Sequence, residues 1–173
     1  MAILRFPRVG STRTVDVYEQ PDRDPDESDQ DFAARVDDYD LRRDIRATVE
    51  LVDREQARAW AYSWMTAIAA DQKRTRESGD ADALGVTPQG IRELAACQRE
   101  VLDGCLLSVH GVALTSDDGG DLDLASIDVN AAGNQRQERR RELIAMLEEC
   151  DLMGPVAQAA RRAQKPDPQM GKS

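Results

Sequence analysis

The sequence predicts a mainly α-helical protein, a helical bundle of three to four helices with a small N-terminal β hairpin or sheet. Three observations predict this fold class. After Asp53, apolar residues recur at spacings of three and four, as they do on one face of a helix. Before Asp53, apolar and polar residues alternate, as they do in a half-buried strand. Only seven of the 173 residues are aromatic and much of the apolar content is Ala, which favours close helix packing.

The first 52 residues are expected to form an extended or β part that contains an acidic linker at residues 20–40. Val15 and Val17 lie on one face of the run "RTVDVYE", and the run "DIRATVEL" alternates in the same way. The stretch between them, "QPDRDPDESDQD", is rich in Pro and Asp and is typical of a connection. These segments, with "AILRF" before them, predict a sheet of two or three strands.

Most of the negative charge lies in that linker. Eleven acidic residues but only two Arg residues fall between Val15 and Asp40, which gives −9 for the stretch against −10 for the chain. Such a surface repels phosphate backbones, so we expect no direct nucleic-acid binding there. The simplest interpretation is a solvated, partly disordered segment. The sharper alternatives are a docking arm for a basic partner and mimicry of DNA.

The helical domain is expected to span residues 53–164, and residues 165–173 are expected to form a flexible tail. Asp53 can cap a first helix that runs to about Arg76. One face of this helix carries a regular stripe, which we interpret as core rather than as an aromatic ligand shelf. The stripe consists of Ala57, Trp60, Ala61, Trp64 and Ile68.

Two further helical regions follow. Thr87 and Pro88 suit the start of a helix that continues through Val109 and ends before Gly111. It should lie at the centre of the domain, because almost every residue of its stripe is apolar. Asn134 can cap the third region, and Pro155 is expected to start a short final helix.

No motif predicts catalysis, a metal site or a cofactor. His110 is the only histidine and is interpreted as a helix-terminal residue, and no nucleophile motif accompanies it. The Asp-rich stretch "TSDDGGDLDLASIDVN" fits no register of a calcium loop, so it is interpreted as an acidic turn and loop. Cys97, Cys105 and Cys150 lack metal-ligand spacing and indicate buried or incidental thiols in a reducing compartment.

The end of the chain contains half of a phosphate-binding loop. Gly171, Lys172 and Ser173 match the second half of a P-loop, but Pro166 stands where the pattern requires Gly. The preceding "KPDP" cannot form a buried strand, so we expect no nucleotide binding. No apolar run approaches 18 residues, so we expect no membrane span, and the apolar N-terminal run is too short for a secretory signal.

The segments "LDGCLLSVHGV", "LDLASID" and "RRELIAMLEECDLMGPVAQAARRAQ" resemble the tail assembly chaperones of long-tailed phages. The resemblance covers about Gln98 to Gln164. It implies a short β-containing start, a helical body and a location in the host cytoplasm. In this family the short product often ends just after a slippery codon run, which can encode Gly-Lys, as at Gly171-Lys172.

The resemblance implies a chaperone that makes no bonds and acts by binding a tail-tube or tape-measure protein. A frameshifted longer form of the chain itself is a further implied partner. The candidate client-facing residues are Leu143, Met146, Leu147, Leu152, Met153 and Val156. The alternatives left open are that these residues only close the core, that the protein is a structural virion or scaffold subunit, or that it is an acidic inhibitor that mimics DNA.

Overall fold

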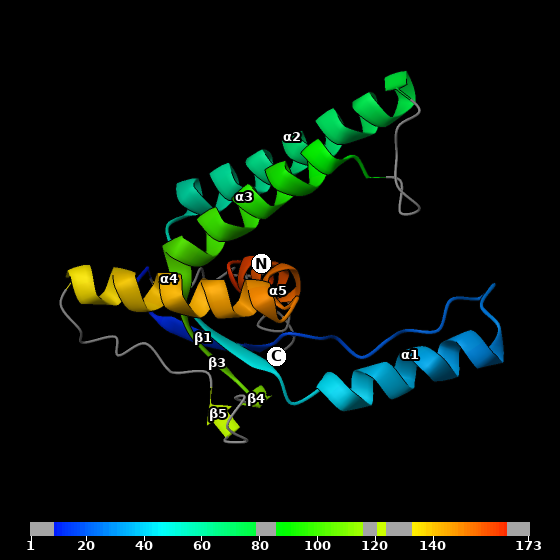
Figure 1. Cartoon of the computed structure of the whole chain (residues 1–173), viewed down its shortest axis with the longest axis horizontal. Coiled ribbons are helices and arrows are strands. Elements are labelled where there is room, and N and C mark those ends of the chain that lie inside the picture. Colours follow the sequence, from blue (N-terminus) through cyan, green and yellow to red (C-terminus); the bar gives the residue numbers. More distant parts are fainter. Residues whose placement is uncertain (1–8, 79–85, 116–120, 124–132, 166–173) are drawn as a thin grey trace, which may run out of the picture.

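The computed structural model describes residues 9–78, 86–115, 121–123 and 133–165. Within these ranges the chain is mainly helical with a small antiparallel sheet, which confirms the predicted fold class. Figure 1 shows the arrangement of the elements. In chain order they are β1 (Thr12–Asp16), α1 (Asp29–Arg42), β2 (Arg46–Glu50), α2 (Arg54–Ser78), α3 (Pro88–Cys105), β3 (Leu106–His110), β4 (Ala113–Thr115), β5 (Asp121–Asp123), α4 (Gly133–Glu149) and α5 (Met153–Ala163).

The main sheet has the order β1-β2-β3, and both pairings are antiparallel. Thr14 lies opposite Thr48 in the first pair, and Arg46 lies opposite His110 in the second. The two strands predicted from alternation are therefore confirmed as β1 and β2. The predicted extended run at residues 2–6 lies outside the described residues. A separate two-stranded ladder joins β4 to β5.

The third strand occupies a stretch that we predicted to be helical. Helix α3 ends at Cys105, and Leu106–His110 is a strand, so the prediction that the helix continues through Val109 is wrong. A short apolar run fits a buried strand as well as a buried helix, and here pairing with β2 decides between them. His110 is consequently at a strand end, where its Nε2 lies 2.9 Å from the Ser108 hydroxyl.

Helices and sheet share one core. Figure 1 shows α2 and α3 side by side as a projecting hairpin, with α4 and α5 near the base of α3. Side chains from both sides of the predicted boundary at residues 52–53 are buried together, so the sheet depends on the helices for its cover. The largest fully buried side chains are Val49, Val101, Leu102, Cys105, Leu106, Val109, Leu143, Leu147 and Val156.

The predicted starts of α2 and α3 are confirmed, whereas the prediction that Asn134 caps the third region is wrong, because Asn134 lies inside α4. The main-chain N–H of Gln56 donates to the Asp53 carboxylate at 2.8 Å, and that of Gly90 donates to the Thr87 hydroxyl at 3.0 Å. Each cap satisfies one of the unpaired donors in a first helical turn. The last helix departs slightly from the prediction, because α5 begins at Met153 rather than at Pro155.

Arg140 of α4 secures the junction between α3 and β3. Its Nε donates to Leu106 O at 2.8 Å and its Nη1 donates to Asp103 O at 2.5 Å. Only 8% of the residue is exposed, and burial lowers the pKa of its guanidinium. The cation thus satisfies carbonyl groups that the end of a helix would leave unpaired.

The close approach of α2 and α3 predicts that Gly104→Ala destabilises the protein. A Cβ atom at Gly104 would lie 2.3 Å from Cζ2 of the buried Trp60 ring, so one of the two helices must shift. We expect a loss of about 1–3 kcal/mol in the free energy of unfolding, measured by urea denaturation. The control Gly133→Ala places its Cβ where no atom lies within 4 Å, and it should not destabilise. Equal stabilities for the two variants would contradict this packing.

The junction contact predicts a difference between neighbouring arginines. Arg140→Met keeps an apolar stem but leaves two carbonyl groups without their donor, so it should cost about 1–3 kcal/mol. Arg141→Met alters an exposed residue and should change stability by less than about 0.5 kcal/mol. Thermal and urea unfolding of both variants measure this difference, and an Arg140 variant as stable as the Arg141 variant would show the contact to be dispensable.

Candidate protein-binding site

The most distinctive external feature is an acidic arm, which we define as residues 19–42. The chain leaves the sheet after Val17 and re-enters it at Ile45, and both residues are buried. Between them, an extended stretch runs outward and α1 returns (Figure 1). The arm carries ten carboxylates and three arginines. The helix at Asp29–Arg42 corrects the prediction of a linker at residues 20–40, because the second half of that range is helical.

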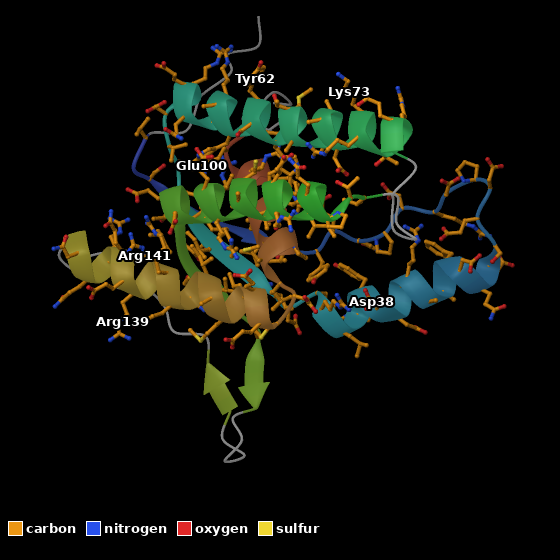
Figure 2. All side chains as sticks on the ribbon, turned by 45° about the horizontal axis from the view of Figure 1, so that its top comes forward. Asp38, Tyr62, Lys73, Glu100, Arg139 and Arg141 are labelled. Atoms are coloured by element: carbon orange, nitrogen blue, oxygen red, sulfur yellow. The ribbon has the colours of Figure 1, made fainter. Side chains whose placement is uncertain are left out.

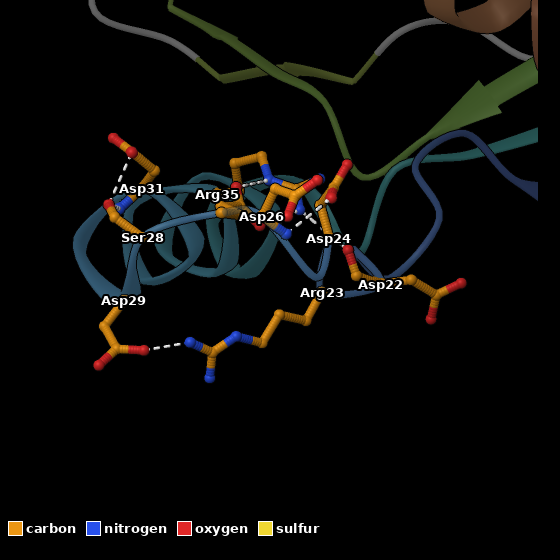
Figure 3. Close-up of polar contacts among 9 residues, drawn as sticks. Asp22, Arg23, Asp24, Asp26, Ser28, Asp29, Asp31 and Arg35 are labelled. Carbon is orange, nitrogen blue, oxygen red and sulfur yellow. Dashed lines mark hydrogen bonds and ion pairs between the residues drawn. The ribbon is translucent and has the colours of Figure 1, made fainter.

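Arg35 fastens the extended stretch to α1. Its guanidinium donates to both carboxylate oxygens of Glu27, at 2.7 and 2.6 Å, and to the main-chain oxygen of Asp22 at 2.9 Å. Figure 3 shows Arg35 beside this stretch and a second link between Arg23 and Asp29. A planar guanidinium that binds a carboxylate through two hydrogen bonds fixes both distance and orientation. The arm is therefore an ordered substructure rather than a loose chain.

The same two arginines flank the ring of Phe32, one of the two aromatic residues of α1. The Arg23 guanidinium carbon lies 5.7 Å and that of Arg35 lies 6.0 Å from the centroid of Phe32. No residue of α1 is buried, although Phe32, Val36 and Tyr39 are half-buried. A helix of this length without a buried face gains little from the core, so its stability depends on local contacts.

The arm contains both paired and unpaired carboxylates. The hydrogen bonds from Arg35 hold the pKa of the Glu27 carboxyl below its usual value, which favours the ionised form. Asp22, Asp26 and Asp37 have no hydrogen bond or ion pair from their side chains to another described residue. These three carboxylates are available to an incoming cation without disruption of the arm.

A second external feature is an apolar strip on α2, formed by Tyr62, Met65 and Ile68. Their exposed fractions are 75%, 68% and 42%. Figure 2 shows Tyr62 directed away from α3. Ile68 was predicted to belong to the buried stripe, and this is wrong. Trp60 and Trp64 do belong to the core, where the Arg161 guanidinium carbon lies 4.2 Å from the Trp64 centroid.

The predicted client-facing residues do not form an exposed surface. Five of the six are buried and Met146 is half-buried, so the interpretation that they close the core is the one that fits the structure. The three consecutive arginines at 139–141 differ in their environments. Figure 2 shows Arg139 and Arg141 extending outward, whereas Arg140 is buried at the α3–β3 junction.

Among the described residues, no group of three or more His, Cys, Asp and Glu side chains is arranged to hold a metal ion. Most of the Asp-rich stretch and the end of the chain, including Pro166 and Gly171, lie outside those residues. Burial raises the pKa of the Cys105 thiol to about 12, so this side chain is an unreactive core residue. Among the helices described, none is long and apolar enough to cross a membrane.

The sequence contains a signal for helix α1, which was not predicted. The N–H of Asp31 donates to the Ser28 hydroxyl at 3.2 Å, and this Ser-x-x-Asp spacing is a known helix start. Phe32, Val36 and Tyr39 follow at helical spacing. The high density of Asp and Pro in the preceding residues obscured both signals.

Comparison with protein-family models, with curated proteins and with solved structures found no match to this chain.

The contacts of Arg35 predict that the arm can be loosened without loss of the core. Arg35→Met should raise the amide hydrogen-exchange rates of residues 29–42 by about tenfold, because the links to Glu27 and Asp22 are lost. The melting temperature should stay the same, since α1 buries no residue. Exchange mass spectrometry and calorimetry measure the two effects. Arg43→Met removes an exposed pair with Asp40 and serves as the control; equal exchange in the two variants would disprove the role of Arg35.

Proposed function

We propose that this protein is a non-enzymatic chaperone that binds an assembly subunit, with the acidic arm as its capture surface. The observation that carries the proposal is an ordered helix, α1, that buries none of its residues and carries unpaired carboxylates. A helix held outside the core contributes little to folding, so its exposed carboxylates are better explained by a contact with another molecule. The resemblance to tail assembly chaperones of long-tailed phages makes the tail-tube or tape-measure protein the expected client.

The charge of the arm supports a basic client surface. Long-range attraction between opposite charges accelerates the encounter of two proteins more than it strengthens the final complex. A chaperone has to capture its client quickly and release it during assembly. Fast association with a complex of moderate strength suits that task. Because α1 projects from the body, the arm can reach a client without a change in the core.

The apolar strip supports a second contact with the same client. Tyr62 and Met65 are large, mostly exposed side chains on a rigid helix, and Met adapts to surfaces of different shape. A chaperone that prevents premature polymerisation has to cover apolar surface of the client. The strip replaces the residues of α4 and α5 as our candidate for this role.

The test is to neutralise the arm without breaking its internal contacts. The triple variant Asp22→Asn, Asp26→Asn, Asp37→Asn removes three negative charges that pair with no described side chain. Capture of tail-tube and tape-measure proteins encoded in the same genome is followed by surface plasmon resonance. We expect association to slow roughly threefold to tenfold at low salt, while dissociation changes less. Added salt should reduce the difference, because the Debye length falls to about 8 Å at 0.15 M.

A matched control removes the same charge elsewhere. Glu100→Gln, Glu138→Gln, Glu149→Gln changes three exposed carboxylates on α3 and α4. This variant should bind the client with nearly unchanged rates. If association slows equally in both variants, only the net charge of the chain matters. If the arm variant captures the client at an unchanged rate, the arm has no role in capture and is only a solvated extension. Failure of the unmodified chain to bind either tail protein would refute the proposed client.

A further inference from the structure

Strand β1 has one free edge. The N–H of Val17 donates to Ile45 O at 2.9 Å, which fixes the residues that bond to the neighbouring strand β2. Because the hydrogen-bonding direction alternates along an antiparallel strand, the main-chain groups of Thr12, Thr14 and Asp16 point to the opposite edge. No described strand pairs there, since β1 is the outer strand of the order β1-β2-β3.

A groove of about 1300 Å³ lies beside this edge. Thr14, Val15 and Asp16 of β1 are among the residues that line it. Tyr18, which precedes the acidic arm, and Tyr39 of α1 also line it, and Arg13, Arg46, Arg162 and Lys165 add positive charge. Arg162 also donates to Asp16 O at 3.1 Å, which closes one end of the free edge. The groove thus combines an unpaired strand with side chains on both flanks.

The groove is positive in a chain that is strongly negative. Arg46 pairs with Asp16, and Arg162 pairs with Glu19. Arg13 instead donates to the main-chain oxygens of Ala163, at 2.7 Å, and Lys165, at 3.1 Å.

These contacts leave two cationic groups of the groove without a carboxylate partner among the described residues. The guanidinium of Arg13 has neutral partners, and no ion pair joins the ammonium of Lys165 to a described carboxylate. Two positive charges therefore remain at the groove, whereas the chain as a whole carries −10.

We propose that this groove binds an extended, acidic segment of another protein, which adds to β1 as a fourth strand. Main-chain hydrogen bonds to Thr12 and Thr14 would supply affinity, as in other cases of strand addition. Acidic side chains of the segment would lie near Lys165 and Arg13, which supplies selectivity. The site is separate from the capture of a basic client surface by the arm.

A second copy of this chain is a poorer occupant. Pairing of two β1 edges would bring two positive grooves together, and each chain carries −10 overall. The extended acidic stretch of the arm is also committed, because Arg35 and Arg23 hold it against α1. Charge complementarity therefore favours a segment from a different protein.

The probe is a fluorescein-labelled peptide, EVTVEVTV, whose binding is measured by fluorescence anisotropy. Two further probes test the mechanism: KVTVKVTV reverses the charge, and an EVTVEVTV peptide methylated on every main-chain nitrogen has no N–H at either edge to donate to a strand ladder. We expect the acidic probe to bind at least about tenfold more tightly than either, which corresponds to one or two hydrogen bonds or charge contacts.

Variants of the chain locate the binding. Thr14→Pro removes the outward N–H and is tolerated at a sheet edge, whereas Thr14→Val keeps it; both lose the hydroxyl contact with Thr48, which is 2.9 Å long. We expect about tenfold weaker binding to Thr14→Pro than to Thr14→Val. Lys165→Glu should also weaken binding, and Lys73→Glu, on α2 (Figure 2), should not.

Several results would overturn the proposal. These are no saturable binding of the acidic probe, equal binding of the methylated probe, and equal effects of the changes at 165 and 73. A dimer in sedimentation analysis that Thr14→Pro abolishes would make a second copy the occupant instead. If Thr14→Pro fails to fold, the methylated probe and the lysine variants still decide the question.

Discussion

The direct passage from α3 into β3 is the constraint on which the rest of the architecture depends. Leu106 is both the residue that follows the helix and the first residue of the strand. No loop separates the two elements, so the direction of α3 fixes that of β3. Gly111 then turns the chain with φ near +80°, where a Cβ would lie 2.3 Å from Asp44 O. The helical hairpin and the sheet are thereby fixed to each other, and Arg140 satisfies the carbonyl groups at the junction.

The structure separates stability from recognition. The core is built from small and branched apolar side chains, and the buried polar pair Asp71–Thr87 fixes the start of α3 to α2. The arm, by contrast, is ordered by charged hydrogen bonds that are accessible to water and therefore contribute little to global stability. Selection on the surface of α1 can consequently change its charge without risk to the fold, which suits a contact region.

The sequence predicted the elements whose signals are local. Alternation identified β1 and β2, and the caps at Asp53 and Thr87 identified the starts of α2 and α3. It could not distinguish a strand from a helix at Leu106–His110, because the choice depends on pairing with β2, which lies far away in the chain. The site was harder still. In the sequence, the apolar residues of α4 and α5 suit a core and a client surface equally well. Only their burial in the structure distinguishes the two roles. Neither the free edge of β1 nor the groove beside it leaves a signature in residue order.

The opposite charges of the arm and the groove raise the question of why the arm does not occupy the groove of its own chain. Glu19, the first residue of the arm, does pair with Arg162 at the groove, at 3.1 Å. Beyond it, the acidic stretch is held away from the sheet, because Arg35 of α1 binds Glu27 of the stretch and Arg23 of the stretch binds Asp29 of α1. The two arginines therefore order the arm and also keep it out of the groove of its own chain. The charge of these arginines is small compared with that of the ten carboxylates of the arm, so the arm still attracts a basic surface. The groove meanwhile stays open to an acidic segment of another protein.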